Sequence, residues 1–110
     1  MLTEVWRFRS GGVELTVTIA GTGPPLLLLH GFPDSAEVWR FQLPVLVAAG
    51  YRVIAPDMRG FGRSDAPADK AAYQIDLILD DILELLRSLE ITEPVGLIGH
   101  DWGAAVGWIF

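Results

Sequence analysis

Two short motifs in this sequence contain residues whose types and spacing could carry out chemistry. Gly99-His100-Asp101-Trp102-Gly103 follows the apolar run 95–98, so a carboxylate lies where a predicted strand turns into a helix. His30-Gly31-Phe32-Pro33 follows a second apolar run, 25–29. A carboxylate is ionised near neutral pH, and Asp101 could therefore act as a nucleophile without a base to deprotonate it.

The glycines on either side of Asp101 fit a sharp strand-to-helix turn. Such a turn strains the backbone of its central residue, and the residues two positions away must be small. Gly99 and Gly103 meet this requirement. The helix predicted to begin at Trp102 would point its first N–H groups at whatever Asp101 attacks. Taken by itself, however, an Asp before a helix is more often an N-cap that accepts from the N–H of Gly103 or Ala104.

Strands that alternate with helices are predicted to position both motifs. A hairpin covers 6–9 and 13–20, and it is followed by buried strands over 25–29, 51–55 and 95–98 and by helices over 38–49, 71–89 and from 102 onward. This order predicts an α/β fold with a mixed, mostly parallel sheet, an N-terminal antiparallel hairpin and helices on both faces. The two motifs should then meet at the sheet edge where ligands bind. Because the last helix has no stop signal, we expect residues 1–110 to be part of one domain.

The composition argues against several classes of function. The chain has 110 residues and a net charge of -6, and its eight basic residues are scattered, which argues against nucleic-acid binding. It contains no cysteine and two histidines, so thiol chemistry and a metal site are not expected. No signal peptide and no apolar segment of membrane-spanning length are recognisable. We expect a cytoplasmic protein that binds no membrane, metal or cofactor.

The loop over 57–67 offers a weaker alternative nucleophile. Gly62-Arg63-Ser64-Asp65-Ala66 has a serine between small residues, but no buried strand directly precedes it. We therefore expect its glycines to let the loop turn, with Asp57 and Arg59 as structural partners. The acidic residues of the helix over 71–89 are expected to be solvated: Asp76, Asp80, Asp81 and Glu84.

Five motifs in order make this sequence resemble the α/β-hydrolase superfamily and, within it, the epoxide hydrolases. They are His30-Gly31-Phe32-Pro33, Trp39-Arg40-Phe41-Gln42, Gly50-Tyr51-Arg52-Val53, DMRGFGRSDAP over 57–67 and Gly99-His100-Asp101-Trp102-Gly103. The resemblance covers nearly the whole chain. It implies the N-terminal part of a single core domain with a partial α/β-hydrolase fold, ending inside the helix after the nucleophile elbow. It also implies that Asp101 opens an epoxide through a covalent ester, that a vicinal diol is released and that no cofactor is used.

The resemblance assigns roles to the neighbours of Asp101. The backbone N–H groups of Phe32 and Trp102 would form the oxyanion hole, and Phe32, Pro33 and Trp102 would line the substrate pocket. In the family a cis peptide bond precedes Pro33, although from the residues alone Phe32-Pro33 could equally form an ordinary turn. The implied structural supports are His30, Gly31, Gly99, His100 and Gly103.

The resemblance also implies that further catalytic groups lie outside these residues. In the family the water-activating His, its acid partner and the lid tyrosines come after the position that matches residue 110. We therefore expect the 110-residue chain alone to be inactive.

Two alternatives remain open. A haloalkane dehalogenase would use the same Asp nucleophile, but those enzymes generally have a polar halide-binding residue in place of Phe32. Trp102 argues against the fluoroacetate-type dehalogenases, which carry Arg after the nucleophile. The other alternative is an inactive fragment that self-associates, or pairs with a missing C-terminal part, through the open edge of the strand over 95–98.

Overall fold

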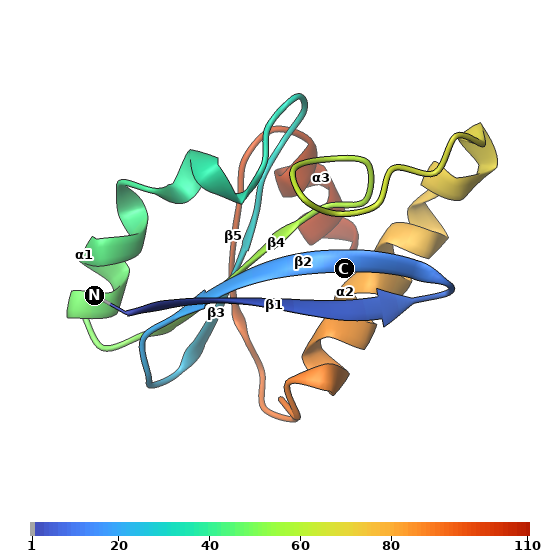
Figure 1. Ribbon diagram of the computed structural model, residues 1–110. Coiled ribbons are helices and arrows are strands. Elements are labelled where there is room, and N and C mark those ends of the chain that lie inside the picture. Colours follow the sequence, from blue (N-terminus) through green and yellow to red (C-terminus); the bar gives the residue numbers. More distant parts are fainter. Residues whose placement is uncertain (1) are drawn as a thin grey trace.

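The computed structural model describes residues 2–110, whose strands form one mixed sheet of five (Figure 1). β1 (Thr3–Ser10) and β2 (Val13–Ala20) make the predicted antiparallel hairpin. With β3 (Pro25–Leu29), β4 (Arg52–Asp57) and β5 (Gly96–Gly99), the strand order is β1-β2-β4-β3-β5. β2 pairs antiparallel with β4, and β3 pairs parallel with β4 and β5. The predicted mixed sheet is confirmed, and its antiparallel part extends to β4.

Helices cover both faces of the sheet, as predicted (Figure 1). α2 (Ile75–Ser88) and α3 (Trp102–Ile109) pack on one face, and α1 (Gln42–Ala48) packs on the other with the 3-10 helix η1 (Ala36–Trp39). The larger hydrophobic cluster includes Leu27, Leu29, Ile54, Ile82, Leu85 and Val106. The smaller cluster, beneath α1, includes Leu28, Trp39, Leu43, Val53 and Ala55. β2, β3 and β4 each contribute to both clusters, and they are the three inner strands of the sheet.

The helix predicted over 38–49 is divided in two. The Ser35 side chain accepts a hydrogen bond from the Glu37 N–H at 3.3 Å and caps η1, and α1 begins only at Gln42. One continuous helix would have placed Pro44 in its interior, where a hydrogen bond is lost and the ring clashes. The observed start keeps Pro44 in the first turn, where its missing N–H is tolerated.

The helix predicted over 71–89 begins later than expected. A 3-10 helix, η2 (Lys70–Tyr73), precedes it and is capped by Asp69, which accepts from the Ala71 N–H at 3.0 Å. Gln74 then has extended backbone, with φ -65° and ψ 147°, so α2 starts at Ile75. This break brings η2 beside the loop that follows β4.

Asp81 was expected to be solvated, but it is buried in an ion pair with Arg59. Arg59 Nε and Nη2 donate to the two carboxylate oxygens at 2.7 Å each, and Nη1 donates to the Ala72 carbonyl at 2.7 Å. The hydrogen bonds that Arg59 donates to Asp81 raise the pKa of Arg59, which keeps the guanidinium charged. The pair ties the loop after β4 to both η2 and α2. The prediction that Arg59 is a structural residue is confirmed.

Removing the charge of Asp81 is expected to destabilise the protein. In the D81N variant the buried guanidinium loses its counter-charge, and we expect the free energy of unfolding to fall by about 2–3 kcal/mol. The matched control is D80N on the same helix. Because the Asp80 side chain is exposed, D80N should change the free energy of unfolding by less than about 0.5 kcal/mol. Urea unfolding of both variants measures the difference. Equal losses in the two variants would contradict a special role for the buried pair.

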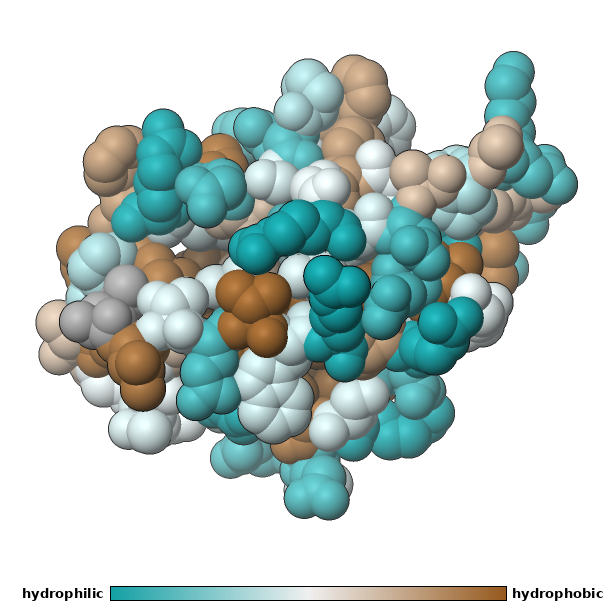
Figure 2. All heavy atoms as spheres, viewed as in Figure 1, coloured by the Kyte–Doolittle hydropathy of each residue, from teal (hydrophilic) through white to brown (hydrophobic). Residues whose placement is uncertain are grey.

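Both edge strands of the described sheet expose apolar side chains, since Val5 and Trp6 of β1 are 46% and 47% exposed, but β1 also carries charged residues. Hydrophilic residues cover much of the face that β1 occupies in Figure 2, and Arg7 of β1 pairs with Glu14 at 3.8 Å. Charged side chains of this kind protect a sheet edge from further pairing. At β5, by contrast, Leu97 and Ile98 are each 37% exposed. The expected open edge is present at β5 within residues 2–110, and it is apolar.

Candidate functional site

Asp101 occupies a strained turn between β5 and α3. Its φ of 57° is in the left-handed region, which non-glycine residues rarely adopt. A Cβ atom on Gly99 would lie 2.7 Å from the Ala104 Cα atom, and one on Gly103 would collide with the Leu29 carbonyl oxygen. The requirement for small residues two positions on either side of Asp101 is therefore confirmed.

The two predicted motifs are in direct contact. The Phe32 N–H donates to Asp101 Oδ2 at 3.3 Å, and a Cβ atom on Gly31 would lie 2.9 Å from that same oxygen. The Phe32–Pro33 peptide bond is cis, as the resemblance implied. The Asp34 N–H also donates to the Gly31 carbonyl at 3.0 Å, so the motif is a turn as well. The segment is therefore a turn built around a cis peptide bond and not an ordinary turn.

The Asp101 carboxylate does not cap α3. Asp101 is at the N-cap position, but its side chain makes no capping hydrogen bond, so the N-cap interpretation is wrong for this carboxylate. The backbone N–H groups of Trp102 and Phe32 instead hold the pKa of the carboxyl below its ordinary value, and the charge of His100 acts in the same direction. An exposed, ionised oxygen is the result.

The lowered pKa of Asp101 can be measured directly. Its carboxylate is stabilised by two N–H groups in the folded state alone, so it should remain ionised to a lower pH than in the unfolded chain. The stabilisation is present above the unfolded pKa and is lost as the pH falls through the folded pKa. We expect a ¹³C NMR titration of the side-chain carboxyl to show a lower midpoint in the folded protein than in urea. An equal or higher midpoint would mean that these N–H groups do not hold the carboxylate.

His30 is held by the backbone on both sides of its ring. Its Nε2 accepts from the Met58 N–H at 2.9 Å, so Nδ1 carries the proton and donates to the Gly31 carbonyl at 2.8 Å. The ring is 2% exposed and joins the loops that follow β3 and β4. Neither nitrogen is free to act as a base.

His100 contributes through its backbone. Its N–H donates to the Leu29 carbonyl at 3.1 Å, and its carbonyl accepts from the Gly103 N–H at 2.9 Å. The side chain is exposed. These contacts fasten the turn around Asp101 to the end of β3.

A cavity of about 320 Å³ opens beside the residues that flank Asp101. Phe32 and Trp102, both predicted to line a pocket, form part of its wall, whereas Pro33 does not. The sequence did not indicate four further lining residues, which are Phe61, Tyr73, Ile75 and Ile78. The three-residue spacing of Ile75 and Ile78 on the apolar stripe of the helix over 71–89 predicts packing against the sheet. The sequence carried no signal that they line a cavity, because a helix that begins at residue 71 has both residues beyond its first turn, whereas α2 begins at Ile75.

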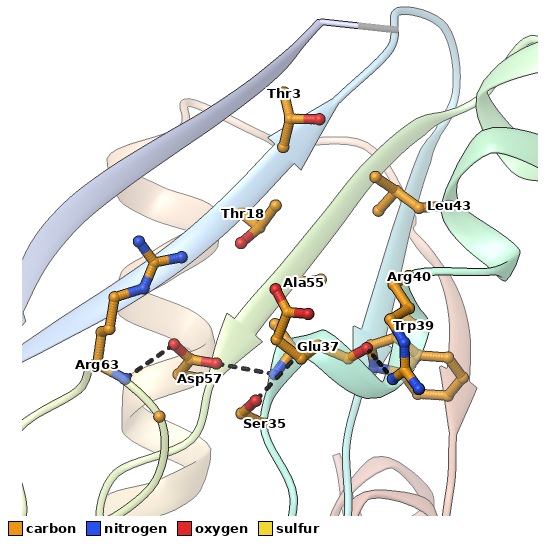
Figure 3. Close-up of a pocket in the computed structure, with 12 residues that line it drawn as sticks. Thr3, Thr18, Ser35, Glu37, Trp39, Arg40, Leu43, Ala55, Asp57 and Arg63 are labelled. Carbon is orange, nitrogen blue, oxygen red and sulfur yellow. Dashed lines mark hydrogen bonds between the residues drawn. The ribbon is translucent and has the colours of Figure 1, made fainter.

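The loop over 57–67 provides structural contacts and no free nucleophile. Ser64 is buried, and its Oγ donates to the Asp57 carbonyl at 2.6 Å and accepts from the Thr16 N–H at 2.9 Å. The Asp57 carboxylate accepts from the N–H groups of Arg63 and Ala36 at 3.1 and 2.8 Å (Figure 3). Asp57 also lines a separate cavity of about 450 Å³, and none of the predicted site residues lines that cavity. The prediction that Asp57 is structural is confirmed.

Within residues 2–110, none of the helices has the length and apolar character that crossing a membrane requires.

Comparisons with known proteins extend the resemblance seen in the sequence. The profile of the alpha/beta hydrolase fold family matches residues 24–110. An epoxide hydrolase of Caballeronia sordidicola is 50% identical over 99 residues, which cover 90% of this chain and 30% of that protein. Epoxide hydrolase 3 of Siraitia grosvenorii is 46% identical over 101 residues, which cover 92% of this chain and 32% of that protein.

Solved structures give the same result. An epoxide hydrolase from Vigna radiata superposes with a TM-score of 0.92 at 41% identity, over 97% of this chain and 33% of that one. Epoxide Hydrolase A from Mycobacterium thermoresistibile gives a TM-score of 0.91 at 43% identity, over 98% of this chain and 34% of that one. The chain therefore spans about a third of the length of the relatives it matches.

Proposed function

Because this chain belongs to the alpha/beta hydrolase fold family, we propose that it supplies the nucleophile and the oxyanion hole of an epoxide hydrolase. One observation carries the proposal: the exposed Asp101 carboxylate at a strained turn, with the Phe32 N–H donating to it at 3.3 Å. The relatives named above support the substrate class, a small-molecule epoxide.

The proposed reaction has two steps. The ionised Asp101 oxygen attacks an sp³ carbon of the epoxide, the C–O bond of the ring breaks, and the released oxygen takes a proton to give a hydroxyalkyl ester. Water then loses a proton to a base and attacks the ester carbonyl carbon. The oxyanion that forms accepts from the N–H groups of Phe32 and Trp102. Its collapse breaks the ester bond, and the departing alkoxide takes the proton of the newly formed carboxyl group, which releases the vicinal diol and restores the carboxylate. The proton that the base took from water replaces the one given to the epoxide oxygen.

We further propose that residues 1–110 are the N-terminal part of one core domain. The chain spans about a third of the length of its relatives. The acid that protonates the epoxide oxygen and the base that activates water would come from the rest of the core. The 110-residue chain alone would then not turn over.

The haloalkane dehalogenase alternative is less well supported at Phe32. The Phe32 ring packs edge-to-face on Phe61, with centroids 5.7 Å apart, and it offers no side-chain donor to a departing halide. For this reason the epoxide reaction is the better fit.

A second proposal concerns the open edge of β5. Its apolar residues Leu97 and Ile98, together with the 92% exposed Trp108, favour pairing with the remaining core or with a second copy of the chain. Size-exclusion chromatography and thermal unfolding of the 110-residue chain test this. A cooperatively melting monomer would count against the pairing proposal.

Isotope labelling tests the nucleophile. The complete core that carries this chain, in excess over an epoxide, is incubated in ¹⁸O-water for a single turnover. Because water attacks the ester, we expect label in the Asp101 carboxylate and none in the first diol formed, read by mass spectrometry. Label in the first diol with none in Asp101 would indicate direct attack by water and would exclude the covalent step.

A further inference from the structure

The segment over 30–36 presents the Phe32 N–H and connects the end of β3 to η1. Phe32 is 62% exposed, so its side chain lies largely outside the core. Its N–H is 3.3 Å from Asp101 Oδ2, which is beyond the usual hydrogen-bond range of about 2.7–3.2 Å. A small displacement of the segment would therefore break this contact. Whether the contact persists depends on how the two ends of the segment are held.

Both ends of the segment are held by adjacent residues at the end of β4. At the first end, His30 Nε2 accepts from the Met58 N–H at 2.9 Å. At the other end, the Ala36 N–H donates to Asp57 Oδ1 at 2.8 Å. Asp57 and Met58 together therefore set where the segment leaves the sheet and where it turns into η1.

The Asp57 side chain is itself held in place. It is 6% exposed, and its Oδ2 accepts from the Arg63 N–H at 3.1 Å (Figure 3). A Cβ atom on Gly62 would lie 2.6 Å from Oδ2, so the loop after β4 closes around the carboxylate. The Ser64 hydroxyl donates to the Asp57 carbonyl at 2.6 Å. One carboxylate oxygen thus holds the loop after β4, and the other holds the segment that carries Phe32.

From these contacts we infer that Asp57 is a positioning residue, which keeps the Phe32 N–H within reach of Asp101 through its hydrogen bond to Ala36. The inference rests on the proposed function for its effect on turnover, whereas the position of the N–H can be measured without a reaction. In the proposed reaction, a carboxylate that is already charged attacks the epoxide, and the Phe32 N–H stabilises the oxyanion of the second step. Loss of the positioning contact should therefore slow ester hydrolysis more than ester formation.

Two variants remove the contact from opposite sides. In D57N the side chain keeps its shape but has one acceptor oxygen for two N–H donors. In Ala36→lactic acid an ester oxygen replaces the Ala36 N–H, so the donor is lost with no change of side chain or charge. This second variant keeps the inference testable if D57N does not fold. The matched control is S35A, which removes the hydrogen bond from the Glu37 N–H to Ser35 Oγ at 3.3 Å in the same segment and leaves the bond to Asp57 in place.

A ¹³C NMR titration of the Asp101 carboxyl in the complete core tests the position of the N–H. The N–H groups of Trp102 and Phe32 hold the pKa of Asp101 low, so the midpoint should rise when the Phe32 N–H moves away. We expect this rise in D57N and in the Ala36 variant, and no change in S35A. Loss of the negative charge in D57N would by itself lower the midpoint, so a rise reports the lost N–H. An unchanged midpoint in both variants, or an equal rise in S35A, would overturn the inference.

Intact-mass spectrometry during turnover of an epoxide tests the effect on the reaction. In D57N and the Ala36 variant, ester hydrolysis should slow at least about 10-fold while ester formation changes by less than about threefold, so the ester on Asp101 accumulates. S35A should match the unsubstituted protein. Ester hydrolysis at the unsubstituted rate in both variants would also count decisively against the positioning role.

The two measurements separate the inference from the proposed function. If the midpoint rises as expected but the unsubstituted core hydrolyses no epoxide, the positioning role stands and the proposed function fails. If epoxides are hydrolysed but the midpoint stays the same in both variants, the positioning role fails and the proposed function stands.

Discussion

Replacement of Asp101 by asparagine (D101N) is expected to abolish epoxide hydrolysis by the complete core, with kcat/KM at least about 10,000-fold lower. The amide keeps the shape of the side chain but carries no negative charge, so it cannot attack the sp³ carbon. The Phe32 N–H, 3.3 Å from Oδ2 in the unsubstituted protein, would still have an oxygen to donate to. D101N should therefore fold normally and fail only in the chemical step.

The control for D101N is D76N. Asp76 is an exposed carboxylate in the first turn of α2, outside the cavity wall. D76N should retain kcat/KM within about twofold. Intact-mass spectrometry after brief exposure to an epoxide provides a second measurement. The unsubstituted protein and D76N should gain the mass of one epoxide, and D101N should not. Full activity in D101N would refute the nucleophile assignment.

The contact between Phe32 and Asp101 could be predicted from sequence because it depends on a general rule. Both residues follow the ends of strands that pair in parallel, and such ends meet at one edge of a sheet. The need for small residues around Asp101 could likewise be predicted from sequence, because the steric requirement of the turn involves only neighbouring residues. No such rule predicts from sequence which charged side chains, far apart along the chain, will pair with one another.

The Arg59–Asp81 pair shows why part of the site was missed. In sequence, Asp81 is one acid among several on an amphipathic helix. Its burial depends on the break at Gln74, which sets where α2 begins and places η2 beside the loop after β4. The same break carries Tyr73 and Ile75 into the cavity wall. An error of a few residues in a predicted helix start therefore conceals both the ion pair and these two lining residues.

Substitution of Gly103 by alanine (G103A) is expected to lower the free energy of unfolding by more than about 4 kcal/mol. Helix propensity alone predicts the opposite, a gain of about 1 kcal/mol, since alanine favours the helix interior. In G103A, steric packing and not helix propensity decides whether the free energy of unfolding rises or falls. A Cβ atom on Gly103 would collide with the Leu29 carbonyl oxygen and lie 2.5 Å from the His30 carbonyl oxygen. Both atoms belong to the backbone at the end of β3, and no change of rotamer can move them.

The matched control is G107A, one turn further along α3. Its Cβ atom would meet only the side-chain end of Leu97, which is 37% exposed and can rotate away. We therefore expect G107A to change the free energy of unfolding by less than about 1 kcal/mol in urea titrations. If G103A and G107A were equally stable, α3 would not be pressed against β3. The close approach that lets the Phe32 N–H reach Asp101 would then need another explanation.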